Sequence, residues 1–137
     1  MFNREEFFKK AAPILEKLYA GRNMDTVKER YVKAIDEFEA LYGEADTLSV
    51  FSVAGRSEIC GNHTDHNRGK VLAASIDLDI IAVAAKSKDA VIRVKSAGFP
   101  EDIVDISSLS PVEAEKGKSQ ALIRGVCDGF VKREYTI

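Results

Sequence analysis

Residues 48–86 read LSVFSVAGRSEICGNHTDHNRGKVLAASIDLDIIAVAAK, and this stretch decides the fold. Leu48 to Ala54 alternates and is rich in β-forming residues, which predicts a strand. Gly55 to Lys70 holds three glycines and many small polar residues, so a loop is expected there. A short strand is expected at Val71 to Ala74, and alternation returns from Ile76 to Lys86. The stretch therefore predicts two strands joined by a polar loop.

Further strands are expected after this stretch. Ser87 to Asp89 has the composition of a turn, so we expect Ala90 to Ser96 to return as the antiparallel partner of the preceding strand. Asp102 to Ile106 predicts one more short strand. The sheet would then have about four strands.

A helix is predicted from Ser119 to Glu134, since its apolar residues recur at helical spacing. Gly125 and Gly129 lie one turn apart within it. Because glycine in a helix interior costs about 1 kcal/mol against alanine, we expect both to mark the close approach of another backbone.

Two amphipathic helices are predicted ahead of the strands. The first, from Asn3 to Tyr19, has Asn3 as its N-cap, and Pro13 is expected to kink it or to begin a second piece. The second, from Thr26 to Tyr42, opens with a capping box of Thr26 and Glu29, with Asp25 as an alternative cap, and Gly43 follows where a left-handed C-cap belongs. The first 45 residues thus predict a helical hairpin with one apolar side.

Composition excludes several classes of partner. Of the 137 residues 45% are hydrophobic and 31% charged, and the net charge is −2 with no run of Lys or Arg, so no nucleic-acid partner is expected. The longest apolar run, Ile76 to Ala85, is too short to span a bilayer and contains Asp77 and Asp79, which we expect on a solvated strand face. The start lacks a secretory signal, so no membrane partner is expected. Cys60 and Cys127 lie far apart, which predicts reduced thiols in a cytoplasmic protein.

The polar loop concentrates groups that bind sugars and anions. Asp and Asn oxygens accept hydrogen bonds from hydroxyls, and the guanidinium of Arg56 can bind an anion through its planar fork. Two other interpretations apply to these residue types. Arg56 alone would be a solvated charge after a strand, and Cys60, His63, Asp65 and His66 could form a metal site, although their spacing matches no regular zinc pattern.

The loop resembles the signature of the galactokinases, a family of the GHMP kinase superfamily, whose usual form is GR-x-N-L-I-G-E-H-T-D-Y-N-G-G. Eight fixed positions match: Gly55, Arg56, Gly61, His63, Thr64, Asp65, Asn67 and Gly69. The positions that differ include Glu58 in place of Asn, Asn62 in place of Glu and His66 in place of Tyr. The resemblance spans roughly Val50 to Ile137.

The resemblance implies transfer of the γ-phosphoryl group of ATP to the 1-hydroxyl of galactose. It implies that Asn62, His63 and Asp65 bind the sugar, with Asp65 accepting two hydroxyls. It implies that Arg56 is the catalytic residue, lying beside the reacting hydroxyl and offsetting charge on the transferred phosphoryl group. A non-catalytic galactose-sensing relative and a GHMP kinase for another sugar remain as alternatives.

The sequence contains no Gly-x-Gly-Leu-Ser-Ser-Ser loop of the kind that cradles ATP phosphates in this family. We therefore expect residues 1–137 to be the N-terminal portion of a galactokinase N-terminal domain, truncated before that loop. Residues 1–45 would be a helical lead-in and residues 48–137 an α+β part. ATP and Mg²⁺ would bind the parent protein, while the fragment alone is expected to hold no cofactor and to be inactive. Surfaces exposed by truncation are expected to cause self-association.

The expected fold class is therefore α+β. It comprises the N-terminal helical hairpin and a mixed or antiparallel sheet of about four strands, with one long helix packed on it. By resemblance this is an incomplete GHMP kinase N-terminal domain, of the fold type named for the second domain of ribosomal protein S5.

Overall fold

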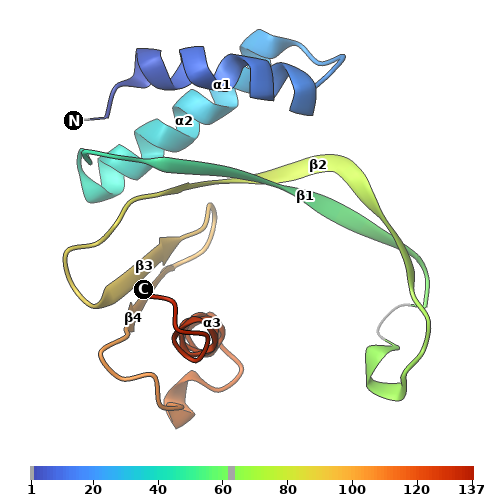
Figure 1. Ribbon diagram of the computed structural model, residues 1–137, viewed down its shortest axis with the longest axis vertical. Helices are drawn as coiled ribbons and strands as arrows, with labels where there is room; N and C mark the ends of the chain where they lie inside the picture. The colour runs from blue at the N-terminus through green and yellow to red at the C-terminus, as the bar shows by residue number, and fades with distance from the viewer. Residues whose placement is uncertain (1, 62–63) are drawn as a thin grey trace. The chain divides into compact units, whose positions relative to one another are not determined.

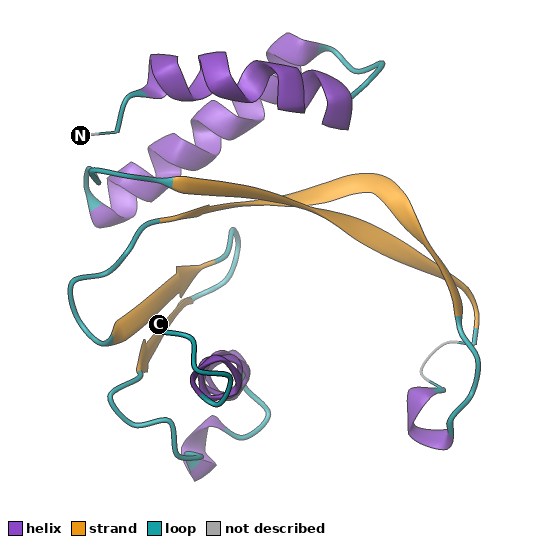
Figure 2. Ribbon diagram, viewed as in Figure 1, coloured by secondary structure: helices purple, strands orange, loops and turns teal. Residues whose placement is uncertain are grey.

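The structure, a computed structural model, describes residues 2–61 and 64–137, with Asp65 described by its backbone. Its class is α+β, as expected (Figures 1 and 2). Contacts divide the chain into two compact units, Met1–Ala85 and Lys86–Ile137. In chain order the elements are α1 (Arg4–Leu18), α2 (Met24–Tyr42), β1 (Ser49–Cys60), η1 (Asp65–Asn67), β2 (Leu72–Ala84), β3 (Val91–Lys95), β4 (Glu101–Asp105), η2 (Glu113–Glu115) and α3 (Ser119–Val131).

Both N-terminal helices form where their apolar periodicity predicts them. The side chain of Asn3 caps α1 by accepting from the Glu6 N–H at 3.0 Å, which confirms the predicted cap. Pro13 lies inside α1, which continues as one helix to Leu18. None of the helices described is long and apolar enough to cross a membrane.

The start of α2 differs from the prediction. The helix begins at Met24, because the Asn23 side chain accepts from the N–H groups of Asp25 and Thr26 at 2.9 and 3.2 Å. The predicted capping box at Thr26 is therefore wrong, since the N-cap of the helix lies about one turn earlier, at Asn23. Gly43 follows the last residue with φ of 78° and ψ of 178°, so the chain leaves the helix through a conformation that favours glycine, outside the left-handed helical region.

The strands form two separate antiparallel pairs, not one sheet of about four strands. β1 pairs with β2 from Ser49↔Ala84 to Cys60↔Leu72, and β3 pairs with β4 from Val91↔Asp105 to Lys95↔Glu101. The expected pairing across the turn at Ser87 is wrong, because β2 pairs back with β1 across the polar loop. β1 also continues six residues past its predicted end, since ladder hydrogen bonds use the backbone and tolerate polar side chains.

The helical hairpin covers one face of the β1–β2 hairpin (Figure 1). Leu15, Tyr19, Val27 and Tyr31 form a buried cluster, against which Val50 of β1 and Ile81 of β2 pack along with other side chains. Ile35, one turn beyond Tyr31, is fully buried. The predicted apolar side of the two helices is thus the side that meets the strands.

In the second unit α3 packs on β4 around a buried arginine. The guanidinium of Arg124 donates to the carbonyl oxygens of Asp105, at 2.7 Å, and Ser108. It also donates to both carboxylate oxygens of Glu115, at 2.7 and 2.9 Å. A Cβ added at Gly125 would meet no atom of the described residues within 4 Å, so the expected close backbone approach is not found among them.

Candidate functional site

The predicted site lies on the β1–β2 hairpin, whose end remote from the helices holds η1 (Figure 1). The pairing is interrupted midway, since Ala54↔Asp79 is followed by Arg56↔Ser75. One residue of β1, Gly55, therefore lies opposite three residues of β2, 76–78. Irregularities of this kind re-aim the side chains that follow them. Arg56 is the first β1 residue paired beyond this bulge.

Arg56 lies in a strand and not in the predicted loop, and its side chain is 70% exposed. Its guanidinium contacts the carboxylate of Glu58, with Nη2 and Nε at 3.2 and 3.3 Å from the same oxygen. The two residues are two apart on one strand, so their side chains share a face of the hairpin. An accessible guanidinium is thus held beside a carboxylate, close to the signature loop.

Two signature glycines are required by close approaches within the loop. Gly61 has φ of 82°, and a Cβ there would overlap the carbonyl oxygen of Lys70. A Cβ at Gly69 would overlap the side chain of Thr64. Any other residue at these positions would force the two sides of the loop apart.

Thr64 and Asn67 close the loop through hydrogen bonds. The Thr64 hydroxyl donates to the carbonyl of Gly61 at 3.0 Å, and the Thr64 carbonyl accepts from the N–H groups of Asn67 and Gly69 at 3.2 and 2.8 Å. The Asn67 side chain accepts from the Gly69 N–H at 3.2 Å. We call Gly61, Thr64, Asn67 and Gly69 the loop frame. These four positions match the signature, but sequence analysis did not predict that they close the loop.

The three predicted sugar-binding residues are only partly covered by the structure. Asn62 and His63 lie outside the described residues, and Asp65, the first residue of η1, is described by its backbone. Their predicted contacts therefore stay predictions. Among the residues whose side chains are described, no group of three or more His, Cys, Asp or Glu is placed to hold a metal ion.

A polar cluster that sequence reasoning missed lies between the helices and the hairpin. The Asp77 side chain is 81% exposed, as expected for a solvated face, but that of Asp79 is only 10% exposed. Asp79 accepts hydrogen bonds from Tyr19, from Ser52 at 2.8 Å and from Arg30 at 2.9 Å. Burial raises the pKa of Asp79, and these hydrogen bonds more than offset it, so that the pKa lies below its usual value.

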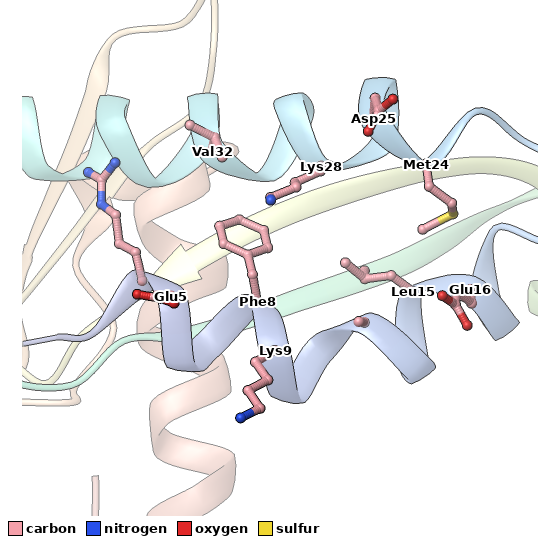
Figure 3. A pocket seen from close by; sticks show the side chains of 11 residues that line it. Glu5, Phe8, Lys9, Leu15, Glu16, Met24, Asp25, Lys28 and Val32 are labelled. Atoms are coloured by element: carbon pink, nitrogen blue, oxygen red, sulfur yellow. The ribbon is translucent and has the colours of Figure 1, made fainter.

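A hollow of the first unit lies elsewhere, between α1 and α2 (Figure 3). Its volume is about 590 Å³, and its apolar lining includes Phe8, Leu15, Met24 and Val32. The Lys28 ammonium lies 5.4 Å from the centre of the Phe8 ring. None of the predicted site residues lines this hollow, so it is not the candidate site.

Comparison with known proteins identifies the hairpin as a family signature. Residues 36–86 match the galactokinase galactose-binding signature, which covers the end of α2, β1, the loop and β2. The match begins within α2, ahead of Val50, the residue at which the resemblance described above begins. No solved structure matches the chain.

Several galactokinases are similar to this chain over part of their length. That of Bacillus subtilis (strain 168) is 29% identical over 101 residues, which cover 73% of this chain and 26% of the relative. That of Exiguobacterium sibiricum is 36% identical over 80 residues, covering 56% and 20%. That of Lactococcus lactis subsp. lactis is 30% identical over 83 residues, covering 61% and 21%. The aligned part thus spans about a quarter or less of these relatives. The chain carries the galactokinase galactose-binding signature and is related in sequence to the galactokinases.

Proposed function

We propose that this chain is the sugar-binding part of a galactokinase, which transfers the γ-phosphoryl group of ATP to the 1-hydroxyl of galactose. The observation that carries the proposal is the signature match over residues 36–86. Two features support it: the loop frame, whose residues alternate in sequence with the positions predicted to bind sugar, is closed by hydrogen bonds and close approaches, and Arg56 is exposed on the strand that leads into the loop.

In this proposal Asn62, His63 and Asp65 bind sugar hydroxyls, and Arg56 stabilises charge on the transferred phosphoryl group. ATP and Mg²⁺ would be bound by the parent protein, because the 137 residues contain no glycine- and serine-rich phosphate loop. Arg56 would then exchange its contact with Glu58 for the phosphoryl oxygens. Both cysteines are unpaired, which accords with the proposed cytoplasmic location.

Sugar binding is tested on the chain itself by titrating galactose and recording amide ¹⁵N–¹H spectra. We expect shifts in residues 61–71, and weaker or no shifts with glucose, which differs at one hydroxyl. Asp65→Asn should weaken galactose binding by about 1.5–3 kcal/mol, since charge-assisted hydrogen bonds are lost. The matched control is Asp36→Asn, an exposed aspartate of α2. Absence of shifts at millimolar galactose would contradict the proposal.

Phosphoryl transfer is tested in two arms. The chain with galactose, ATP and Mg²⁺ should form no galactose 1-phosphate above a buffer control. In a longer chain that includes a phosphate-binding loop, Arg56→Ala should lower kcat more than it raises KM, because the proposed interaction is made in the transition state. Unchanged kcat in that variant would rule out the role assigned to Arg56.

A further inference from the structure

Four elements of the first unit meet at one set of polar side chains, which we call the polar junction: Tyr19, Arg30, Tyr31, Ser52 and Asp79. Tyr19 follows α1, Arg30 and Tyr31 belong to α2, Ser52 to β1 and Asp79 to β2. One carboxylate oxygen of Asp79 accepts from Tyr19 and Ser52, and the other accepts from Arg30. The hydroxyls of Tyr19 and Tyr31 lie 2.8 Å apart.

The polar junction is partly buried, since the Arg30 side chain is 38% exposed and Ser52 is exposed. Tyr19 and Tyr31 are 5% and 4% exposed, and both belong to the apolar cluster of the unit. Replacing a buried ionic group with apolar residues is often neutral or stabilising, so such a group is weak evidence for a stabilising role. Its directional hydrogen bonds, in contrast, select one alignment of the groups that they join. The polar junction therefore specifies how the helices and strands are aligned.

The polar junction lies at the edge of the bulge. Counted from the Ser49↔Ala84 end of the ladder, Ala54↔Asp79 is the last regular pair before the irregularity. The next pair is Arg56↔Ser75. A slip of one residue here would turn Arg56 to the opposite face of the hairpin. Fixing Asp79 in place thus fixes the face on which Arg56 lies.

A second contact reaches into the bulge itself. Arg22, in the connection between α1 and α2, lies 2.7 Å from the carboxylate of Asp77 and also donates to its backbone carbonyl. Asp77 is one of the three β2 residues opposite Gly55. The helical hairpin therefore contacts the bulge at Asp77 and the edge of the bulge at Asp79.

We propose that Asp79 is a positioning residue for the signature hairpin. Through the polar junction it uses the N-terminal helices to fix the register of the bulge, and hence the direction of Arg56. The proposal rests on the proposed function for the role of Arg56, but the effect on the bulge is independent of any ligand.

The test is amide hydrogen exchange in Asp79→Asn, which keeps the size of the side chain and removes its charge. We expect exchange at Arg56, Ser57 and Ser75 to become roughly tenfold faster or more, while residues 50–53 keep their protection. Asp36→Asn is the matched control, since Asp36 also pairs with an arginine, Arg4, at 2.6 Å, but within the helical hairpin. It should leave exchange in the β1–β2 hairpin unchanged.

Two results would overturn the proposal. Unchanged exchange at Arg56 and Ser75 would show that Asp79 does not control the bulge, and equal acceleration at all hairpin amides would show a merely structural role. If Asp79→Asn does not fold, Ser52→Ala removes one donor to the carboxylate and must give the same local pattern.

A galactose titration of the same variants separates this proposal from the proposed function. If the unaltered chain binds galactose, Asp79→Asn should weaken binding several-fold although Asp79 lies outside the loop, and unchanged affinity would overturn its role in positioning the site. If the unaltered chain does not bind galactose, the proposed function fails, and hydrogen exchange alone decides whether Asp79 positions the bulge.

Discussion

Gly61 faces the carbonyl oxygen of Lys70 so closely that the two sides of the signature loop leave no room for a Cβ between them. The same glycine has φ of 82°. Gly61 therefore combines a positive φ with a close contact. A glycine that has the same φ without such a contact can separate the two effects.

Gly61→Ala should open the loop. We expect fast hydrogen exchange at Gly69 and Val71 and loss of any galactose binding, because the added methyl overlaps the Lys70 carbonyl. Gly21→Ala is the control: Gly21 also has φ of 82°, but its added Cβ would meet no described atom within 4 Å. It should cost about 1 kcal/mol of unfolding free energy and leave the loop closed. Equal effects of the two substitutions would mean that backbone strain alone explains the role of Gly61.

Arg68→Gly should stabilise the chain by about 1 kcal/mol. Arg68 has φ of 60°, a left-handed conformation that is unfavourable for residues with a Cβ, and the usual signature has glycine at this position. Urea denaturation would measure the gain. Lys70→Gly is the control, since Lys70 has no positive φ and glycine there should only increase the entropy of the unfolded chain. A loss of stability in Arg68→Gly would contradict the expectation.

Asp79 should make stability depend on pH in the acid range. A carboxyl group whose pKa is lowered by folding contributes stability above its unfolded pKa, about 3.9, and this contribution is lost as the pH falls through the folded-state pKa. At pH 7, Asp79→Asn should cost about 1–3 kcal/mol, since buried donors lose their partner.

The difference between the unaltered chain and Asp79→Asn should stay constant from pH 7 to about pH 5 and shrink below about pH 4. Urea denaturation over that range measures it, with Asp36→Asn as the exposed control. A difference that persisted unchanged at pH 2–3 would show that the charge of Asp79 is not what the polar junction uses.

Self-association should involve the face of the β1–β2 hairpin that the helices leave uncovered. Val53 and Ile80 lie opposite each other there, 62% and 74% exposed. Adjacent apolar side chains of this kind favour contact with a second copy. Sedimentation over a dilution series should show a mass that rises with concentration, and Ile80→Lys should abolish the rise. Ile59→Lys, at a residue 65% exposed near the loop, should not. A strictly monomeric unaltered chain would refute the expectation.

Local sequence signals predicted the helices well and the strand pairing poorly. Periodicity and the Asn3 cap depend on neighbours within a few residues, and both are confirmed. The turn composition at Ser87 predicted a hairpin, yet β2 pairs with β1 across the polar loop. Turn composition shows where a chain can reverse, but it does not show which strand β2 pairs with. That choice depends on the ladder between β1 and β2, which are separated by the eleven residues 61–71.

The polar junction could not be predicted for the same reason. An aspartate that alternates with apolar residues in a strand normally faces solvent, as Asp77 does. The burial of Asp79 depends on Tyr19 and Arg30, which lie 60 and 49 residues away in sequence. The loop frame is different, because close approaches require glycine at Gly61 and Gly69, and this requirement leaves a pattern in the sequence itself.

The loop frame has a consequence for how this hairpin can be altered. Among the described residues, the hydrogen bonds of the frame join 61, 64, 67 and 69 to one another, so these contacts close the loop without using the helices. In sequence, positions 62, 63, 65 and 66 alternate with the frame residues. A library that randomises those four positions and keeps Gly61, Thr64, Asn67 and Gly69 would therefore separate changes in sugar specificity from changes in the residues that close the loop.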